Sequence, residues 1–217
     1  IKKFTSYLLI GILFLSNAYA QEMDFFWVKQ YGSDNNPNQI QSVVSDNLNK
    51  IIAFTDFEGE FDIDGIVHNS VDGSDLLIYV LNEDGEFEWS MVGGGPGNQI
   101  AQEVHCDAEG NIYIMGKFNA TMELNGISFQ SNGAFDMFLA KYTNDGSPVW
   151  IKTFGGPNSE SIETMKIRNN RIYLAGRFYD YTILQNDTIY SADGTDVFVS
   201  KLNLDGELLK TITAGGE

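Results

Sequence analysis

Residues 105–109 gather side chains that bind metals, because they read His-Cys-Asp-Ala-Glu. Thiolate, imidazole and carboxylate ligands of this kind suit a zinc ion. The chain repeats itself, however, and in that repeat Cys106 aligns with Ser45 and Ile167. This position falls on the inward face of a strand, which predicts a buried thiol rather than a ligand. His68 has no neighbouring His or Cys to complete a second set, so we expect no metal site.

Two loops are rich in oxygen ligands for calcium: residues 33–38 read Ser-Asp-Asn-Asn-Pro-Asn, and residues 62–65 read Asp-Ile-Asp-Gly. Calcium prefers carboxylate and carbonyl oxygens. Neither loop has the ligand spacing of an EF-hand, and Asp and Asn also form turns without any ion. We therefore favour a turn-forming role, expect no cofactor, and keep calcium as the alternative.

Paired carboxylates could hydrolyse a glycosidic bond if they lie about 5 to 9.5 Å apart. Among 30 Asp and Glu residues such pairs are unavoidable, and no pair is set apart by its neighbours. The sequence contains no G-x-S-x-G, phosphate-binding loop or H-E-x-x-H motif. We therefore assign no catalytic residue.

The composition predicts a folded, acidic protein. Of the 217 residues, 43% are apolar and 13% aromatic, which favours a well-packed globular chain. The 13 Lys and Arg residues against 30 Asp and Glu give a net charge of −17. A surface this negative repels phosphate backbones, so a nucleic-acid partner is excluded as a working hypothesis.

The first 20 residues have the pattern of a secretory signal peptide. Lys2 and Lys3 supply the charged start, residues 7–15 the apolar core, and residues 18–20 an Ala-Tyr-Ala cleavage site. The apolar run is shorter than the roughly 20 residues that cross a bilayer. We expect cleavage after Ala20, no membrane span in the mature chain, and a secreted or outer-surface location. The single cysteine cannot form an internal disulfide.

The elements that position these side chains recur with a fixed period. Trp27, Trp89, Trp150 and Lys210 are spaced by 62, 61 and 60 residues. Such a period indicates a repeat architecture, with repeats over 27–88, 89–149 and 150–209 and a fourth beginning at 210. Other positions keep the same phase: Gly32, Gly94, Gly155 and Gly215; the pairs Asp84-Gly85, Asp145-Gly146 and Asp205-Gly206; and Asp75, Asp136 and Asp196.

Within a repeat the pattern is that of strands. The Asp-Gly pairs predict tight turns between apolar runs. A middle section around Asn125-Gly126 or Asp64-Gly65 predicts a further short hairpin. No segment of the mature chain has the period of a long helix. About four antiparallel strands per repeat of about 60 residues describe an all-β fold of propeller blades, and this length is too great for one turn of a solenoid.

These positions resemble the bacterial seven-bladed β-propeller repeats known as SBBP repeats. The resemblance is carried by residues 136–156, with Phe138, Lys141 and Trp150 among them, and by Asn-Ile-Tyr-Ile-Met-Gly at 111–116. It covers residues 25–217 and implies a secreted or cell-surface bacterial protein, often with a C-terminal sorting domain for type IX secretion. This chain departs from the pattern in its longer middle section and in Lys210, which replaces the tryptophan.

We expect a fragment of a longer protein. The sequence starts with Ile1, and three repeats cannot close a ring of four to eight blades. A strand expected over residues 25–31 would then lie on an open edge.

We expect a non-catalytic interaction or structural scaffold whose loops bind a protein or glycan partner. The alternative is a propeller-type enzyme acting on polysaccharide, as a glycoside hydrolase or lyase. An enzyme would need acids or a His that break the symmetry of the repeat.

Overall fold

The computed structural model describes residues 29–32 and 39–216 and contains only strands, turns and loops in these ranges. Three four-stranded antiparallel sheets account for most of it. Sheet 1 contains β1 (Gln39–Ser45), β2 (Ile51–Ile63), β3 (Ile66–Leu81) and β4 (Phe87–Gly93). Sheet 2 contains β5 (Gln99–Cys106), β6 (Ile112–Phe118), β9 (Asp136–Tyr142) and β10 (Pro148–Phe154). Sheet 3 contains β11 (Ser161–Arg168), β12 (Arg171–Leu184), β13 (Asp187–Asn203) and β14 (Leu208–Ala214).

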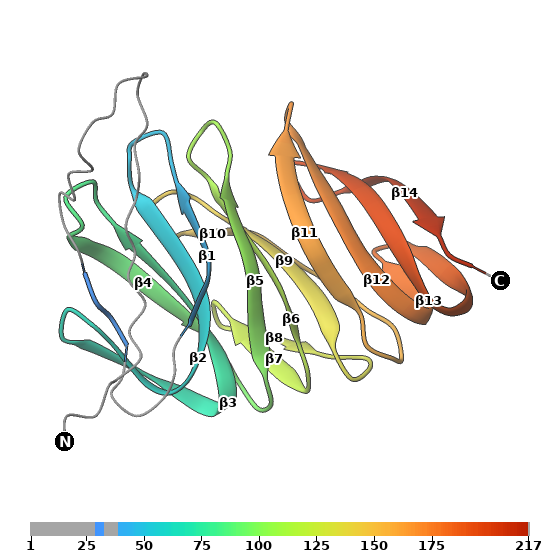
Figure 1. Ribbon diagram of the computed structural model, residues 1–217, viewed down its shortest axis with the longest axis horizontal. Coiled ribbons are helices and arrows are strands. Elements are labelled where there is room, and N and C mark those ends of the chain that lie inside the picture. Colours follow the sequence, from blue (N-terminus) through green and yellow to red (C-terminus); the bar gives the residue numbers. More distant parts are fainter. Residues whose placement is uncertain (1–28, 33–38, 217) are drawn as a thin grey trace, which may run out of the picture.

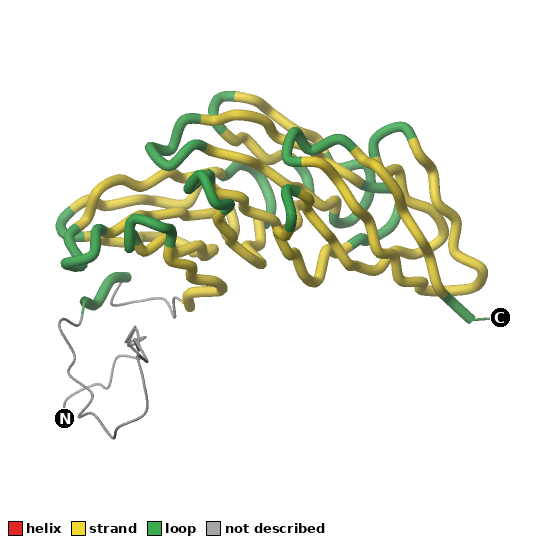
Figure 2. Tube along the Cα trace, turned by 90° about the horizontal axis from the view of Figure 1, so that it is seen from above, coloured by secondary structure: helices red, strands yellow, loops and turns green. Residues whose placement is uncertain are grey.

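The three sheets follow one another along the chain and stand side by side (Figure 1). Each sheet is a meander in which sequential strands pair, as expected when tight turns join them. Seen from above, the sheets form a row of strands and loops (Figure 2). The all-β class predicted from the sequence is confirmed. The described sheets do not close into a ring.

Asparagine or threonine side chains fold the Asp-Gly turns. Asn82 Oδ1 accepts hydrogen bonds from the amides of Asp84 (3.0 Å) and Glu86 (2.9 Å), and Asn203 does the same in sheet 3. The glycine that follows adopts a φ of +77° at Gly85, a conformation that glycine reaches without strain. These local bonds explain why one turn recurs in all three sheets.

The middle-section hairpin is also present. β7 (Thr121–Leu124) and β8 (Ile127–Gln130) pair around Asn125 and Gly126, both with positive φ. In sheets 1 and 3 the same excursion is continuous with the long strands β2, β3, β12 and β13.

Two apolar layers lie between the sheets. The layer between sheets 1 and 2 includes Phe54, Ile78 and Phe138. The layer between sheets 2 and 3 includes Leu139 and Phe198. Strands of sheet 2 therefore contribute side chains to both layers, which explains why they are almost continuously apolar.

The strand expected over residues 25–31 is wrong in its described part. Residues 29–31 form no strand, and only Gly32 pairs with Asp62 in an isolated bridge. Tyr31 instead places its ring 5.7 Å from that of Tyr79 on the face of sheet 1. A segment without neighbouring strands to pair with gains more from burying this ring than from extending. Residues 25–28, with Trp27, lie outside the described residues.

Each sheet is offset from the repeat as marked by tryptophan. The sheets span residues 39–93, 99–154 and 161–214, so that each ends with the strand carrying the next marker, Trp89 in β4 and Trp150 in β10. In the part of the chain that the structure describes, no helix has the length and apolar character needed to cross a membrane. The predicted leader, residues 1–20, lies outside this part.

Candidate functional site

The largest hollow described on the molecule is a groove across the first strands of the three sheets. β1, β5 and β11 lie next to one another, and the groove over them has a volume of about 580 Å³. Its lining mixes apolar side chains with polar and charged ones. The polar and charged members are Gln41, Ser42, Gln102, Glu103, His105, Lys117 and Glu163.

A β-bulge shapes each first strand at the same place. The strand pairing slips by one residue at Gln41 in β1, at Gln102 in β5 and at Glu163 in β11, positions 61 residues apart. A bulge leaves one residue unpaired and redirects its side chain. The three bulges therefore present a row of two amides and one carboxylate along the groove.

Gln102 is the central member of this row. Its Nε2 donates a hydrogen bond to Ser161 Oγ at 3.2 Å, which connects sheet 2 to sheet 3. Its Oε1 is buried and has no hydrogen-bond partner among the described residues. The amide thus offers an acceptor to a ligand with hydroxyl or amide hydrogens.

The residue after each bulge ties neighbouring sheets together. Ser42 Oγ accepts the Val104 amide at 3.1 Å, and Glu103 Oε2 accepts the Met165 amide at 2.8 Å. The same Glu103 oxygen lies 3.2 Å from His105 Nε2. Because these groups are occupied in holding strands, they are positioned as structural contacts rather than as a free acid and base.

The groove supports hydrogen bonding to a ligand better than chemistry on one. Glu163 is paired with Arg177 at 3.0 Å on an exposed surface. Residues 29–32 and 39–216 contain no group of three or more His, Cys, Asp or Glu that could hold a metal ion.

No family model matches the chain. No curated protein matches it either. Among solved structures, two variants of the Synechocystis apocarotenoid oxygenase are similar at 12% and 11% sequence identity, with TM-scores of 0.42 and 0.38. The matches cover 83% and 78% of this chain, which spans only 40% and 36% of the oxygenase chains. A likeness this weak carries no conclusion about activity.

The predicted tryptophan and Asp-Gly positions meet across sheets. The ring of Trp89 in β4 lies against Gly146 in sheet 2, and the ring of Trp150 in β10 lies against Gly206 in sheet 3. A Cβ at either glycine would come within 3.1–3.2 Å of the indole. Trp150 Nε1 also donates to the Leu204 carbonyl at 3.1 Å. The two columns therefore form one contact between successive sheets.

The second aspartate column forms a clasp with the glycine corners. Asp75, Asp136 and Asp196 are buried. Asp136 accepts the amides of Asn132 (3.0 Å) and Gly133 (3.3 Å), and its counterparts accept amides in the same loop. A Cβ on the corner glycine would overlap the carboxyl group, at 2.2 Å for Gly155. Burial raises the pKa of Asp136 even though these amides lower it.

Residues 105–109 do not form a metal site. Asp107 Oδ1 accepts the amides of Glu109 (3.1 Å) and Asn111 (2.9 Å), and Oδ2 accepts the Tyr113 hydroxyl at 2.9 Å. Cys106 packs against the layer between sheets 1 and 2. Burial, aided by two nearby aspartates, raises the pKa of this thiol to about 12, so it is protonated and unsuited to bind a metal.

Of the two calcium candidates, residues 33–38 lie outside the described residues. In the other loop, Asp62 Oδ1 accepts the Gly65 amide at 2.9 Å. Asp64 lies 3.5 Å from Lys29 Nζ and 3.2 Å from the Tyr31 hydroxyl. This loop is a turn whose carboxylates already have protein partners.

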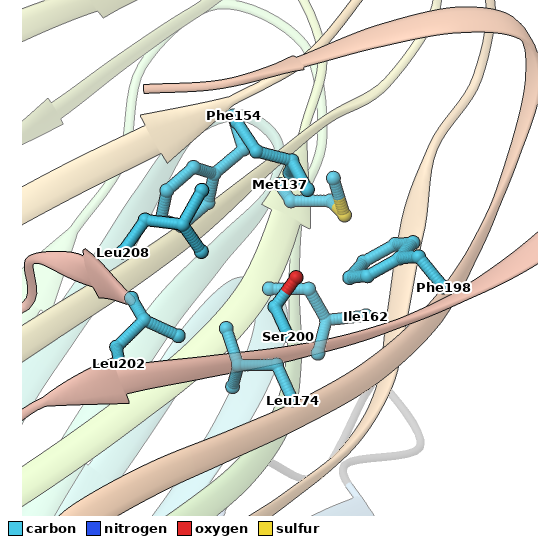
Figure 3. Close-up of a pocket in the computed structure, with 9 residues that line it drawn as sticks. Met137, Phe154, Ile162, Leu174, Phe198, Ser200, Leu202 and Leu208 are labelled. Carbon is cyan, nitrogen blue, oxygen red and sulfur yellow. The ribbon is translucent and has the colours of Figure 1, made fainter. Parts of the chain in front are cut away.

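A second hollow lies inside the apolar layer between sheets 2 and 3 (Figure 3). Its volume of about 10 Å³ is that of a single water molecule, and Ser200 is the one polar side chain in its lining. Figure 3 shows Met137, Phe154, Phe198 and Leu208 around it. It is a packing gap rather than a ligand site.

Sequence reasoning missed the groove. The bulge residues Gln41, Gln102 and Glu163 share the 61-residue period, which was the available signal. Their chemistry differs from that of their neighbours only after the bulge turns them, and no residue type marks a bulge in advance.

Proposed function

We propose that the protein is a secreted or cell-surface scaffold, built from propeller blades of the SBBP kind, that binds partners without catalysing a reaction. Three features support blades: four-stranded meanders, face-to-face packing, and first strands gathered on one side. The protein then acts through its surfaces, and the groove over β1, β5 and β11 is the surface that offers a ligand hydrogen bonds.

One observation carries the scaffold role: the contact that joins the sheets occurs twice, and its third copy is uncovered. On sheet 2 the face toward sheet 3 includes Tyr113, Met137 and Leu139, all fully buried. We call the corresponding surface of sheet 3 its far face; its apolar members are Tyr173, Ala175, Val197, Val199 and Ile212.

The far face of sheet 3 is exposed where its counterpart is covered. Val197 is 51% exposed, Val199 44% and Ile212 56%. A contiguous apolar surface of this kind marks an interaction site. A further sheet of the same repeat would present the apolar partner side chains that sheets 2 and 3 present to their own neighbours.

The groove would take a partner rich in hydrogen-bonding groups, either a glycan or a protein strand. The net charge of −17 disfavours nucleic acid. Calcium enters the proposal only as an ion to be tested, because the one described candidate loop has its carboxylates occupied.

Sedimentation of the purified protein at increasing concentration tests the scaffold role. Burying an exposed apolar face is favourable, so we expect concentration-dependent association that Val199→Asp weakens at least several-fold. Val71→Asp is the control, because Val71 is 73% exposed on β3 and lies off the far face. A wild-type protein that stays monomeric throughout, or one that both substitutions affect equally, would contradict the proposal.

Export has its own test. The mature protein recovered outside the cytoplasm of its host should begin at Gln21, as N-terminal sequencing would show. An intact leader on the folded protein would refute secretion by this route. Hydrolysis of a polysaccharide by the pure protein, abolished by changing an acid in the groove, would instead establish the enzyme alternative.

A further inference from the structure

Glu160 is a fully buried acid at the junction of sheets 2 and 3, directly before β11. Its Oε2 accepts the Gly156 amide at 3.0 Å. Its Oε1 is buried and has no hydrogen-bond partner among the described residues. An ionised carboxylate with one oxygen in this state is costly, because the lost hydration is not replaced.

The preceding repeat has a neutral amide at the same position. Gln99 precedes Glu160 by 61 residues, is likewise fully buried, and opens β5 as Glu160 leads into β11. Gln99 Nε2 donates to the carbonyl of Thr121 at 3.4 Å. This contact connects the start of sheet 2 to the β7–β8 hairpin, so the position uses a donor.

A matching carbonyl lies close to Glu160. Tyr181 stands 60 residues after Thr121, and its carbonyl oxygen lies 2.1 Å from the point where a Cβ of Gly156 would be. Glu160 Oε1 lies 3.3 Å from the same point. A carboxylate oxygen beside a carbonyl oxygen is repelled by it, whereas a protonated one can donate a hydrogen bond to it.

The charges around Glu160 also favour the neutral form. Asp136 of β9 is buried, and its charge opposes a second negative charge. On β6, Lys117 lies over the ring of Phe135 at 5.1 Å. Glu163 of β11 and Arg177 of β12 are paired with each other at the surface. No ion pair found in the described residues includes Glu160.

We propose that Glu160 is held as a carboxylic acid in the folded protein, where it replaces the glutamine of the preceding repeat, and that losing its proton loosens the junction between sheets 2 and 3. Burial, with Asp136 as a smaller contribution, raises the pKa of Glu160 from its usual 4.5 to about 7. The junction then responds to pH near neutrality.

The direction of the response follows from proton binding. Between pH 4.5 and about pH 7 the folded state holds a proton at Glu160 that the unfolded state releases. The stability that this proton supplies is complete below pH 4.5 and is lost as the pH rises through about 7. Glu160→Gln keeps the donor at all pH values and should remove this loss.

Thermal unfolding from about pH 5 to about pH 8 tests the proposal with three proteins: wild type, Glu160→Gln and Gln99→Glu. We expect the melting temperature of Glu160→Gln to exceed that of wild type by a margin that grows by several degrees with pH. Gln99→Glu is the matched variant, and it should add a second fall of the same direction.

Parallel melting curves for wild type and Glu160→Gln would overturn the proposal. So would a rise in the wild-type melting temperature with calcium at about pH 8 that Glu160→Gln lacks, because the oxygen would then hold a cation rather than a proton. If a variant fails to fold, infrared spectroscopy of the wild type still decides, because a protonated buried carboxyl has a carbonyl band that Glu160→Asp would shift. Absence of that band at pH 6 would refute the proposal.

Discussion

At the scale of single residues, glycine and aspartate determine how closely the strands and corners approach. Gly176 is required by proximity rather than by an unusual φ, since a Cβ there would lie 2.2 Å from the Ser161 carbonyl and 2.7 Å from the Phe198 ring. Gly116 has the same surroundings in sheet 2. These contacts involve backbone, which cannot move aside as a side-chain tip can.

Gly176→Ala is therefore expected to lower the free energy of unfolding by about 1–3 kcal/mol through overpacking. Urea denaturation would measure the change. Gly216→Ala is the control, because no atom lies within 4 Å of its would-be Cβ. An alanine at 176 that is tolerated as well as one at 216 would show that the strand moves to accommodate it.

At the scale of elements, each sheet is fastened to the next by the tryptophan of its last strand. The contact of Trp150 with the turn at Gly206 is supplemented by its hydrogen bond to Leu204. Trp89 makes the same contact with Gly146, but its Nε1 is buried without a partner in the described residues. The two positions form a natural comparison of one contact with and without its hydrogen bond.

Trp150→Phe should therefore destabilise the protein by about 1 kcal/mol more than Trp89→Phe, which removes no hydrogen bond. Chemical denaturation of both variants gives the difference. Equal losses, or a larger loss at Trp89, would show that the hydrogen bond contributes nothing to joining the sheets.

Much of the element structure could be predicted from the sequence, because it depends on local chemistry. The Asp-Gly turns, the Asn125-Gly126 hairpin and the all-β class follow from residues near one another in the chain. The pairing of Trp150 with Gly206 could not be predicted, since the two are 56 residues apart. The bulge at Gln102 and the orphaned oxygen of Glu160 likewise depend on packing, which periodicity does not report.

At the scale of the whole molecule, the chain is a row of similar sheets joined by similar contacts. In such a row each unit is stabilised mainly by its neighbours. Sheet 2 is covered on both faces, whereas the far face of sheet 3 is exposed although its residues resemble those of sheet 2. Exposure therefore depends on what packs against a repeat, and sheet 3 is the unit expected to exchange its amide hydrogens fastest.

The central claim, that the far face of sheet 3 receives a further sheet of the same repeat, has a direct test. A second copy of residues 156–216 can be appended after residue 216, with Val199→Cys as a reporter. Cys106→Ser removes the native thiol, and Ser45 shows that the repeat accepts serine there. We predict that the added repeat slows maleimide labelling at position 199 by about tenfold or more, because the site becomes buried, and leaves labelling of a Val71→Cys control unchanged. Equal labelling rates at position 199 with and without the added repeat would contradict the claim.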